Sequence, residues 1–164
     1  MNLLKVTMKS DFQNKLEVNL YFIKSDFKDI LVRIGKKVFE EKERFLVKFN
    51  KNHDLTEIDK YLWISEKDSF LPHQIFNESL SELDNLVLFN GSFNKIEKLK
   101  GFKKIIISPD VKITKFEGFE KFMLFSNEAL TEDILKNIKG KLVQNKIEHK
   151  IYYEYNSFKW KLLN

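Results

Sequence analysis

The chain has 164 residues, of which 43% are hydrophobic and 14% aromatic, and this excludes an intrinsically disordered protein. The absence of cysteine excludes disulfides, thiolate metal sites and a cysteine nucleophile. The net charge of +5 comes almost entirely from lysine, and acidic residues are interspersed with it, whereas a dedicated phosphate-binding surface favours clustered arginine.

The N-terminal residues show weak periodicity and no signal-peptide pattern. We interpret Met1–Lys15 as an N-terminal extension and residues 16–164 as a single domain. No apolar run approaches the length that spans a bilayer, so we expect a cytoplasmic protein without a membrane segment.

Strand and helix patterns alternate from Leu16 onward. Leu16–Ile23 reads as a buried strand, Asp26–Lys42 as an amphipathic helix with Asp26 as its N-cap, and Arg44–Phe49 as a second strand. The short connections predict that the two strands run parallel.

The turn between the first strand and the first helix is Lys24-Ser25-Asp26, which has no glycine where a nucleotide phosphate would approach. We therefore predict a single α/β domain of three-layer, Rossmann-like type. Its mostly parallel central sheet carries helices on both faces, and it has no phosphate-binding glycine loop.

A second helix and an unusual connector follow. Thr56–Asp59 resembles a capping box, and Leu55, Ile58 and Leu62 form the apolar side of this helix. Because Pro72 disfavours a helical conformation at the residue before it, Ser69–His73 is predicted to be extended and to lie on the surface. A surface connector so rich in Trp, Phe and Pro is either a flap over the core or a docking patch.

The second half of the chain predicts three more strands, a last helix and a return strand. The strands are Leu86–Phe89, Lys104–Ile107 and Phe122–Ser126, and the helix is Leu130–Asn145 with Thr131 as N-cap. Ile147–Tyr155 alternates in the manner of a strand. The buried face of the last helix is predicted to contain Ile134, Leu135, Ile138, Leu142 and Val143.

The segment Leu62–His73, LWISEKDSFLPH, resembles the signature of the chi subunit of bacterial DNA polymerase III. Trp63, Ser69, Phe70, Pro72 and His73 fall in register with it. The resemblance implies a clamp-loader accessory subunit without catalytic activity or cofactor. Such a subunit links the clamp loader, through the psi subunit, to the acidic C-terminal tail of single-stranded DNA-binding protein, and it meets DNA only indirectly.

The resemblance also implies two binding surfaces. The first docks psi or another clamp-loader component, and it consists of Trp63, Phe70, Leu71, Pro72 and His73. The second receives the acidic tail on basic residues of the last helix beside an apolar pocket. The matching positions are Lys136, Lys139, Lys141 and Lys146, with Phe125 and Leu142 as the pocket lining. Without the resemblance, these lysines read as a solvated helix face.

Two other function classes compete with this interpretation. His53, His73 and His149 lie far apart without metal-ligand spacing, and an acid–base pair of Asp68 with His73 is less favoured than a packing role, so we predict no catalytic or metal site. The alternative is a basic module that binds single-stranded nucleic acid, because His149–Trp160 interleaves lysine with aromatic residues. In a folded strand, half of those aromatics would face the core.

Overall fold

The computed structural model describes residues 15–65, 71–77, 79–81, 84–94, 101–113 and 115–163. Of the predicted extension Met1–Lys15, all but Lys15 lies outside the described residues, and the Lys15 ammonium pairs with the Glu148 carboxylate at 2.7 Å. In chain order the elements are β1 (Glu17–Phe22), α1 (Phe27–Glu40), β2 (Phe45–Lys48), α2 (Leu55–Ile64), β3 (Gln74–Ile75), β4 (Leu86–Phe89), β5 (Lys104–Ile107), β6 (Lys121–Ser126), α3 (Glu132–Gln144), β7 (Glu148–Asn156) and β8 (Lys159–Leu163).

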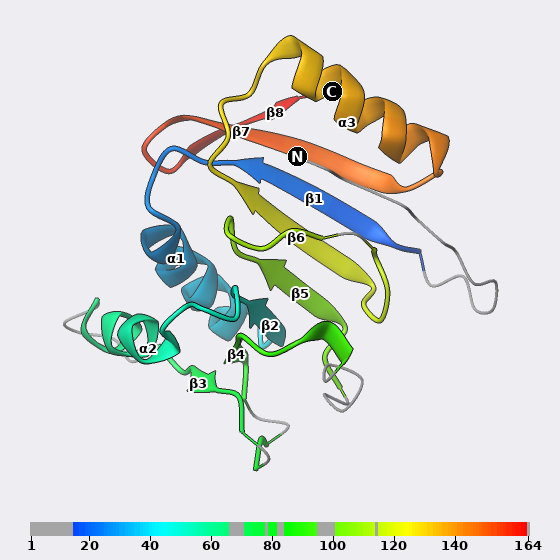
Figure 1. The fold of residues 1–164 in the computed structure, drawn as a ribbon. Helices are drawn as coiled ribbons and strands as arrows, with labels where there is room; N and C mark the ends of the chain where they lie inside the picture. The colour runs from blue at the N-terminus through cyan, green and yellow to red at the C-terminus, as the bar shows by residue number, and fades with distance from the viewer. Residues whose placement is uncertain are drawn as a thin grey trace.

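The strands form one sheet in the order β3-β4-β2-β5-β6-β1-β7-β8 (Figure 1). Every neighbouring pair is parallel except β7 with β8, which is antiparallel. The predicted α/β class with a mostly parallel sheet is therefore confirmed. As predicted, β1 and β2 run in the same direction, but β5 and β6 lie between them.

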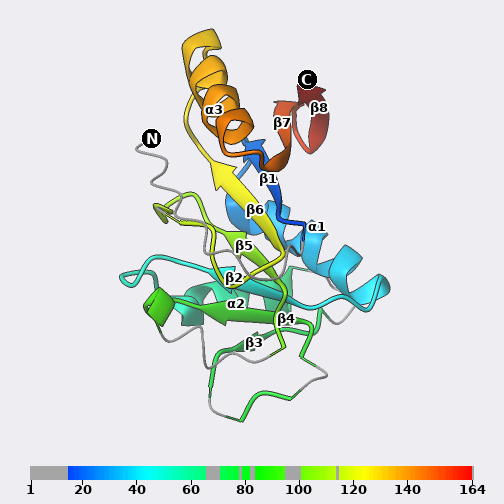
Figure 2. The same cartoon turned by 90° about the vertical axis from the view of Figure 1, so that its right-hand side faces the viewer.

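The sheet separates two apolar clusters, and this is why its central strands are apolar in sequence on both faces. α1 and α2 pack in one cluster, against residues such as Val47 and Phe125. α3 packs in the other cluster through Ile138 and Leu142, on the opposite side of the sheet (Figure 2). None of the helices in the described part of the chain is long and apolar enough to cross a membrane.

The N-caps predicted from the sequence are correct for α1 and α3 but not for α2. The Asp26 carboxylate accepts from the Lys28 N–H at 3.1 Å, and the Thr131 hydroxyl accepts from the Ile134 N–H at 3.3 Å, so both predicted N-caps are confirmed. The predicted capping box at Thr56–Asp59 is wrong. α2 begins earlier, because Asp54 caps it by accepting from the Thr56 N–H at 2.9 Å.

A buried carboxylate closes the turn between β1 and α1. Glu154 of β7 is fully buried, and its Oε2 accepts from the backbone N–H groups of Lys24 and Ser25 at 2.7 and 2.9 Å. Its Oε1 accepts from the Ser25 hydroxyl at 2.5 Å and from the Phe158 N–H at 2.6 Å. Burial raises the pKa of Glu154, but these hydrogen bonds, led by Ser25, outweigh it, so the pKa lies below its ordinary value of 4.5.

We expect Glu154→Gln to lower the free energy of unfolding at pH 7 by roughly 3 kcal/mol, because the amide nitrogen would face backbone donors. In the unsubstituted protein, the stability contributed by the carboxylate is complete above pH 4.5 and is lost as the pH falls through the lower folded-state pKa. Urea unfolding at pH 7 and in a series below pH 4.5 measures both effects. Glu117→Gln, at an exposed carboxylate, is the control, and equal acid sensitivity in all three proteins would contradict the assignment.

Candidate docking surface

At the C-terminal end of α2, neighbouring side chains differ sharply in their exposure to solvent. Leu62 is 1% exposed and belongs to the cluster under α1 and α2, whereas Trp63 is 50% and Ile64 75% exposed. Large apolar side chains with this much exposure, next to one another at a helix end, indicate a surface for a partner rather than for the core.

Leu71 holds the end of the connector, residues 71–73, against α1. It is 4% exposed, and its Cδ1 atom would lie 2.9 Å from a Cβ atom at Gly35 of α1. Any side chain at position 35 would therefore collide with Leu71. The absence of a side chain there lets the connector approach the helix closely.

His73 joins the connector to α2. Its side chain is fully buried, with Nδ1 2.7 Å from the Leu71 carbonyl oxygen and Nε2 3.2 Å from both the carbonyl and a carboxylate oxygen of Asp59. The imidazole ring lies 5.2 Å from the Trp63 ring, centroid to centroid. With both nitrogens facing oxygen atoms, the imidazole has one orientation, and it supports the inner side of Trp63.

The structure thus brings together four of the five residues predicted for docking, in two different roles. Trp63 is exposed and Pro72 is half-buried, while Leu71 and His73 are buried supports beneath them. Phe70 lies outside the described residues, and so does Asp68 of the possible acid–base pair with His73.

Three contributors were missed by the sequence analysis: Ile64, Asp59 and Gly35. The signal for Gly35 was available, since a glycine inside an amphipathic helix indicates close approach of a neighbour.

The lysines predicted to bind an acidic tail do not share one face of α3. At about 100° per residue, Lys136, Lys139 and Val143 fall on one side of the helix, and Lys141 falls on the other. Lys146 follows the helix and is exposed. The prediction that Val143 is buried is wrong, because it is 65% exposed. The buried stripe is formed by Ile134, Leu135, Ile138 and Leu142, and Val143 lies a quarter-turn beyond it.

The two residues predicted to line the tail pocket are not brought together. Leu142 is 2% exposed and packs in the cluster under α3, whereas Phe125 is 4% exposed and packs on the other side of the sheet. Val143 is instead the apolar side chain that accompanies the lysines on the outer face of α3.

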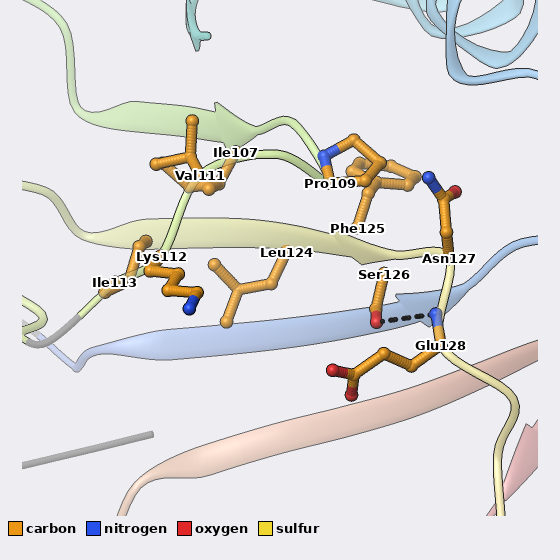
Figure 3. Close-up of a pocket in the computed structure, with 10 residues that line it drawn as sticks. All are labelled: Ile107, Pro109, Val111, Lys112, Ile113, Leu124, Phe125, Ser126, Asn127 and Glu128. Atoms are coloured by element: carbon orange, nitrogen blue, oxygen red, sulfur yellow. Dashed lines mark hydrogen bonds between the residues drawn. The ribbon is translucent and has the colours of Figure 1, made fainter. Parts of the chain in front are cut away.

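Two pockets lie at the carboxyl ends of the central strands. The first, of about 330 Å³, is mostly apolar, with Lys112 and Glu128 as its charged residues (Figure 3). Its lining is Ile107, Pro109, Val111, Lys112, Ile113, Leu124, Phe125, Ser126, Asn127 and Glu128. The Glu128 N–H donates to the Ser126 hydroxyl at 3.2 Å, so this polar pair fixes the loop before α3 rather than facing a ligand.

The second pocket, of about 660 Å³, contains a polar group of Ser108, Asp110 and His53. The Asp110 carboxylate accepts from the Ser108 hydroxyl and lies 3.1 Å from His53 Nδ1. Burial raises the pKa of Asp110, but these two hydrogen bonds outweigh it, so the pKa lies below its ordinary value. A serine nucleophile needs its hydrogen bond to a base such as imidazole, and here the hydroxyl is bound to the carboxylate.

The three histidines lie apart, and each contacts different neighbouring residues. His53 pairs with Asp110, His73 with Asp59 and Leu71, and His149 Nδ1 lies 2.8 Å from the Ile147 carbonyl oxygen. Among the described residues, no group of three His, Asp or Glu side chains could hold a metal ion.

Two aromatic residues of the last strands, Tyr152 and Trp160, pack against Tyr21 of β1. The Tyr21 ring stacks on Phe125 at 4.7 Å and on Tyr152 at 4.9 Å, and Trp160 meets Tyr21 edge-on at 5.6 Å. Base stacking needs an open ring face, and both faces of Tyr21 are covered in this arrangement.

Comparison with protein families matches residues 16–133 to the family model of the DNA polymerase III chi subunit, HolC. The match spans more than half of the chain and contains the whole candidate docking surface. The chain therefore belongs to the class of accessory subunits of DNA polymerase III that act in DNA replication. Within that class it is a member of the chi subunit (HolC) family, as its sequence signature predicted. Comparison with curated proteins and with solved structures found no match.

Gly35→Ala places a methyl group that must displace Leu71 from a packed position, at an overpacking cost of about 1–3 kcal/mol. Alanine also brings a gain of about 1 kcal/mol in a helix, so we expect the free energy of unfolding to fall by up to about 2 kcal/mol. Chemical denaturation measures it. Gly140→Ala in α3 is the matched control, since nothing lies within 4 Å of its new methyl group, and it should stabilise the protein. Equal stabilisation by both substitutions would contradict the role of Gly35.

Proposed function

We propose that the chain is a non-catalytic adaptor that links the clamp loader, through psi or another clamp-loader component, to the acidic tail of single-stranded DNA-binding protein. The observation that carries the proposal is the exposed pair Trp63 and Ile64 on a support formed by Leu71 and His73. Because this support fixes residues 71–73 and the inner side of Trp63, this part of the surface would lose little conformational freedom when a partner binds.

The proposed psi surface lies inside the segment that matches the chi family, and it keeps the five predicted residues, Trp63, Phe70, Leu71, Pro72 and His73. Trp63 is its proposed anchor, because buried tryptophans carry a large share of interface energy. Ile64 extends the apolar area, and Leu71 and His73 act from beneath.

For the acidic tail, we propose a narrower site than the sequence suggested. Lys136, Lys139 and Val143 share the outer face of α3, so they can offer charge to carboxylates and an apolar contact to a terminal aromatic ring. Lys146 extends this face beyond the helix. Lys141 lies on the other side of α3, and we propose that it does not contact the tail directly.

We further propose that the domain is a three-layer, Rossmann-like scaffold that has lost phosphate binding. The turn after β1 contains no glycine, and its backbone N–H groups at Lys24 and Ser25 already donate to Glu154. In dinucleotide-binding folds, the pyrophosphate binds at this turn and the helix that follows it. A carboxylate of the chain itself satisfies the donors that a phosphate would need.

The ring contacts favour the adaptor over the nucleic-acid alternative. Tyr21 stacks on both Tyr152 and Phe125, and Trp160 meets Tyr21 edge-on. We therefore propose that DNA is contacted only through the single-stranded DNA-binding protein.

Trp63→Ala should weaken binding to a purified psi subunit by about 2 kcal/mol or more, because the partner loses its largest apolar anchor. Stability should change little, since the side chain is half exposed. Isothermal titration calorimetry measures the affinity. Phe70→Ala tests the neighbouring predicted position.

Tyr155→Ala is the matched control, because Tyr155 is an aromatic residue with a similar exposure of 54% in a different part of the fold. Equal affinities for the Trp63 and Tyr155 variants would place the partner elsewhere.

Lys136→Glu/Lys139→Glu should abolish binding of a peptide that copies the acidic C-terminal tail of single-stranded DNA-binding protein, because both charges on the outer face of α3 are reversed. Fluorescence anisotropy at two salt concentrations measures binding, and the affinity of the unsubstituted protein should fall as salt rises, since lysine provides point charges without a guanidinium fork.

Lys51→Glu/Lys115→Glu has the same change in net charge at two other exposed lysines and is the control. The site on α3 is disproved by retention of tail binding after the Lys136 and Lys139 substitutions, or by the same loss in the control. Val143→Ser tests the apolar contact separately.

A further inference from the structure

Among the strands in the described part of the chain, β8 lies at an edge of the sheet. It is the last strand in the order of the sheet, and within the sheet it is hydrogen-bonded only to β7. Five residues long, it is the longer edge, because β3 at the other end has two residues. The outer side of an edge strand presents backbone N–H and C=O groups that a further strand can pair with.

The two faces of β8 differ in chemistry. Opposite residues of paired strands point to the same face, so Leu162 lies beside Tyr152, on the α1 side, and Lys161 lies beside Tyr153, on the α3 side. Lys159 shares the side of Lys161 by alternation along the strand.

The exposure of these side chains leaves both faces available to a partner. Leu162 is 44% exposed and Trp160 is half-buried. Lys159 and Lys161 are exposed, and neither forms an ion pair with any residue in the described part of the chain.

We propose that β8 binds, by strand addition, an extended segment of a partner protein in which acidic and apolar residues alternate. The acidic side chains of this segment face Lys159 and Lys161, and its apolar side chains extend the surface of Trp160 and Leu162. Backbone hydrogen bonds to β8 supply affinity, and the lysines select the acidic pattern.

The charge of the edge disfavours a second copy of this chain as the occupant. If β8 paired antiparallel with itself about Lys161, this residue would face its own counterpart, and like charges directly opposite are destabilising. Lysine on an edge strand also discourages pairing with neutral strands. An acidic strand removes both obstacles. This surface is separate from the proposed tail site on α3 and does not depend on it.

The test uses the full chain and a fluorescein-labelled peptide in which glutamate and valine alternate. Anisotropy should show saturable binding, and hydrogen exchange of the β8 backbone amides should slow when the peptide is added. The same peptide N-methylated at every residue keeps its charges but cannot donate ladder hydrogen bonds, and it should not bind. Lys159→Glu/Lys161→Glu should weaken binding of the first peptide at least about tenfold, while Lys51→Glu/Lys115→Glu should not.

Three results would overturn the proposal. Equal binding of the N-methylated peptide would show charge attraction without strand pairing. Unchanged exchange in β8 on peptide binding would place the peptide elsewhere. Protection of β8 that depends on protein concentration in the absence of peptide would identify a second copy as the occupant. The comparison of the two peptides uses the unsubstituted protein, so it holds even if the lysine variant fails to fold.

Discussion

The Glu154 carboxylate connects two parts of the chain that are about 130 residues apart in sequence. It binds backbone donors in the turn before α1 and in the turn between β7 and β8, so one buried group fixes both the start of a helix and the end of the sheet. A buried charge is tolerated only when it is fully hydrogen-bonded, and Glu154 accepts four hydrogen bonds. The position of the edge strand β8 depends on this carboxylate.

The docking surface depends on a second close contact, that of Leu71 with Gly35. It brings residues 71–73 onto α1, and His73 joins them to α2 through Asp59. The buried Leu71 and His73 side chains hold the surface in place, while the exposed Trp63 and Ile64 side chains provide the apolar area that a partner can contact. A surface built in this way can be apolar enough to bind a partner without collapsing into the core.

The proposed binding surfaces occupy different parts of the molecule. The docking surface lies beside α1 and α2, the tail site lies on the outer face of α3 on the opposite side of the sheet, and β8 forms the edge. This separation suits an adaptor, because a rigid sheet can hold several partners at once without competition between them. Only the first surface lies wholly within the segment that defines the family, and α3 after residue 133 and both C-terminal strands lie beyond it.

The sequence by itself determined the α/β class, the positions of β1, α1, β2, β4, β5, β6 and α3, and the family, because periodicity, N-caps and the signature at Leu62–His73 are local properties. Only the tertiary structure decided which predicted residues are exposed. Phe125 and Leu142 are both apolar, but strand and helix geometry directs them to opposite sides of the sheet, and Val143 falls outside the buried stripe of α3. The contacts of Glu154 with the turn before α1 and of Gly35 with Leu71 could not be predicted from the sequence either, because each joins segments that meet only when the domain folds.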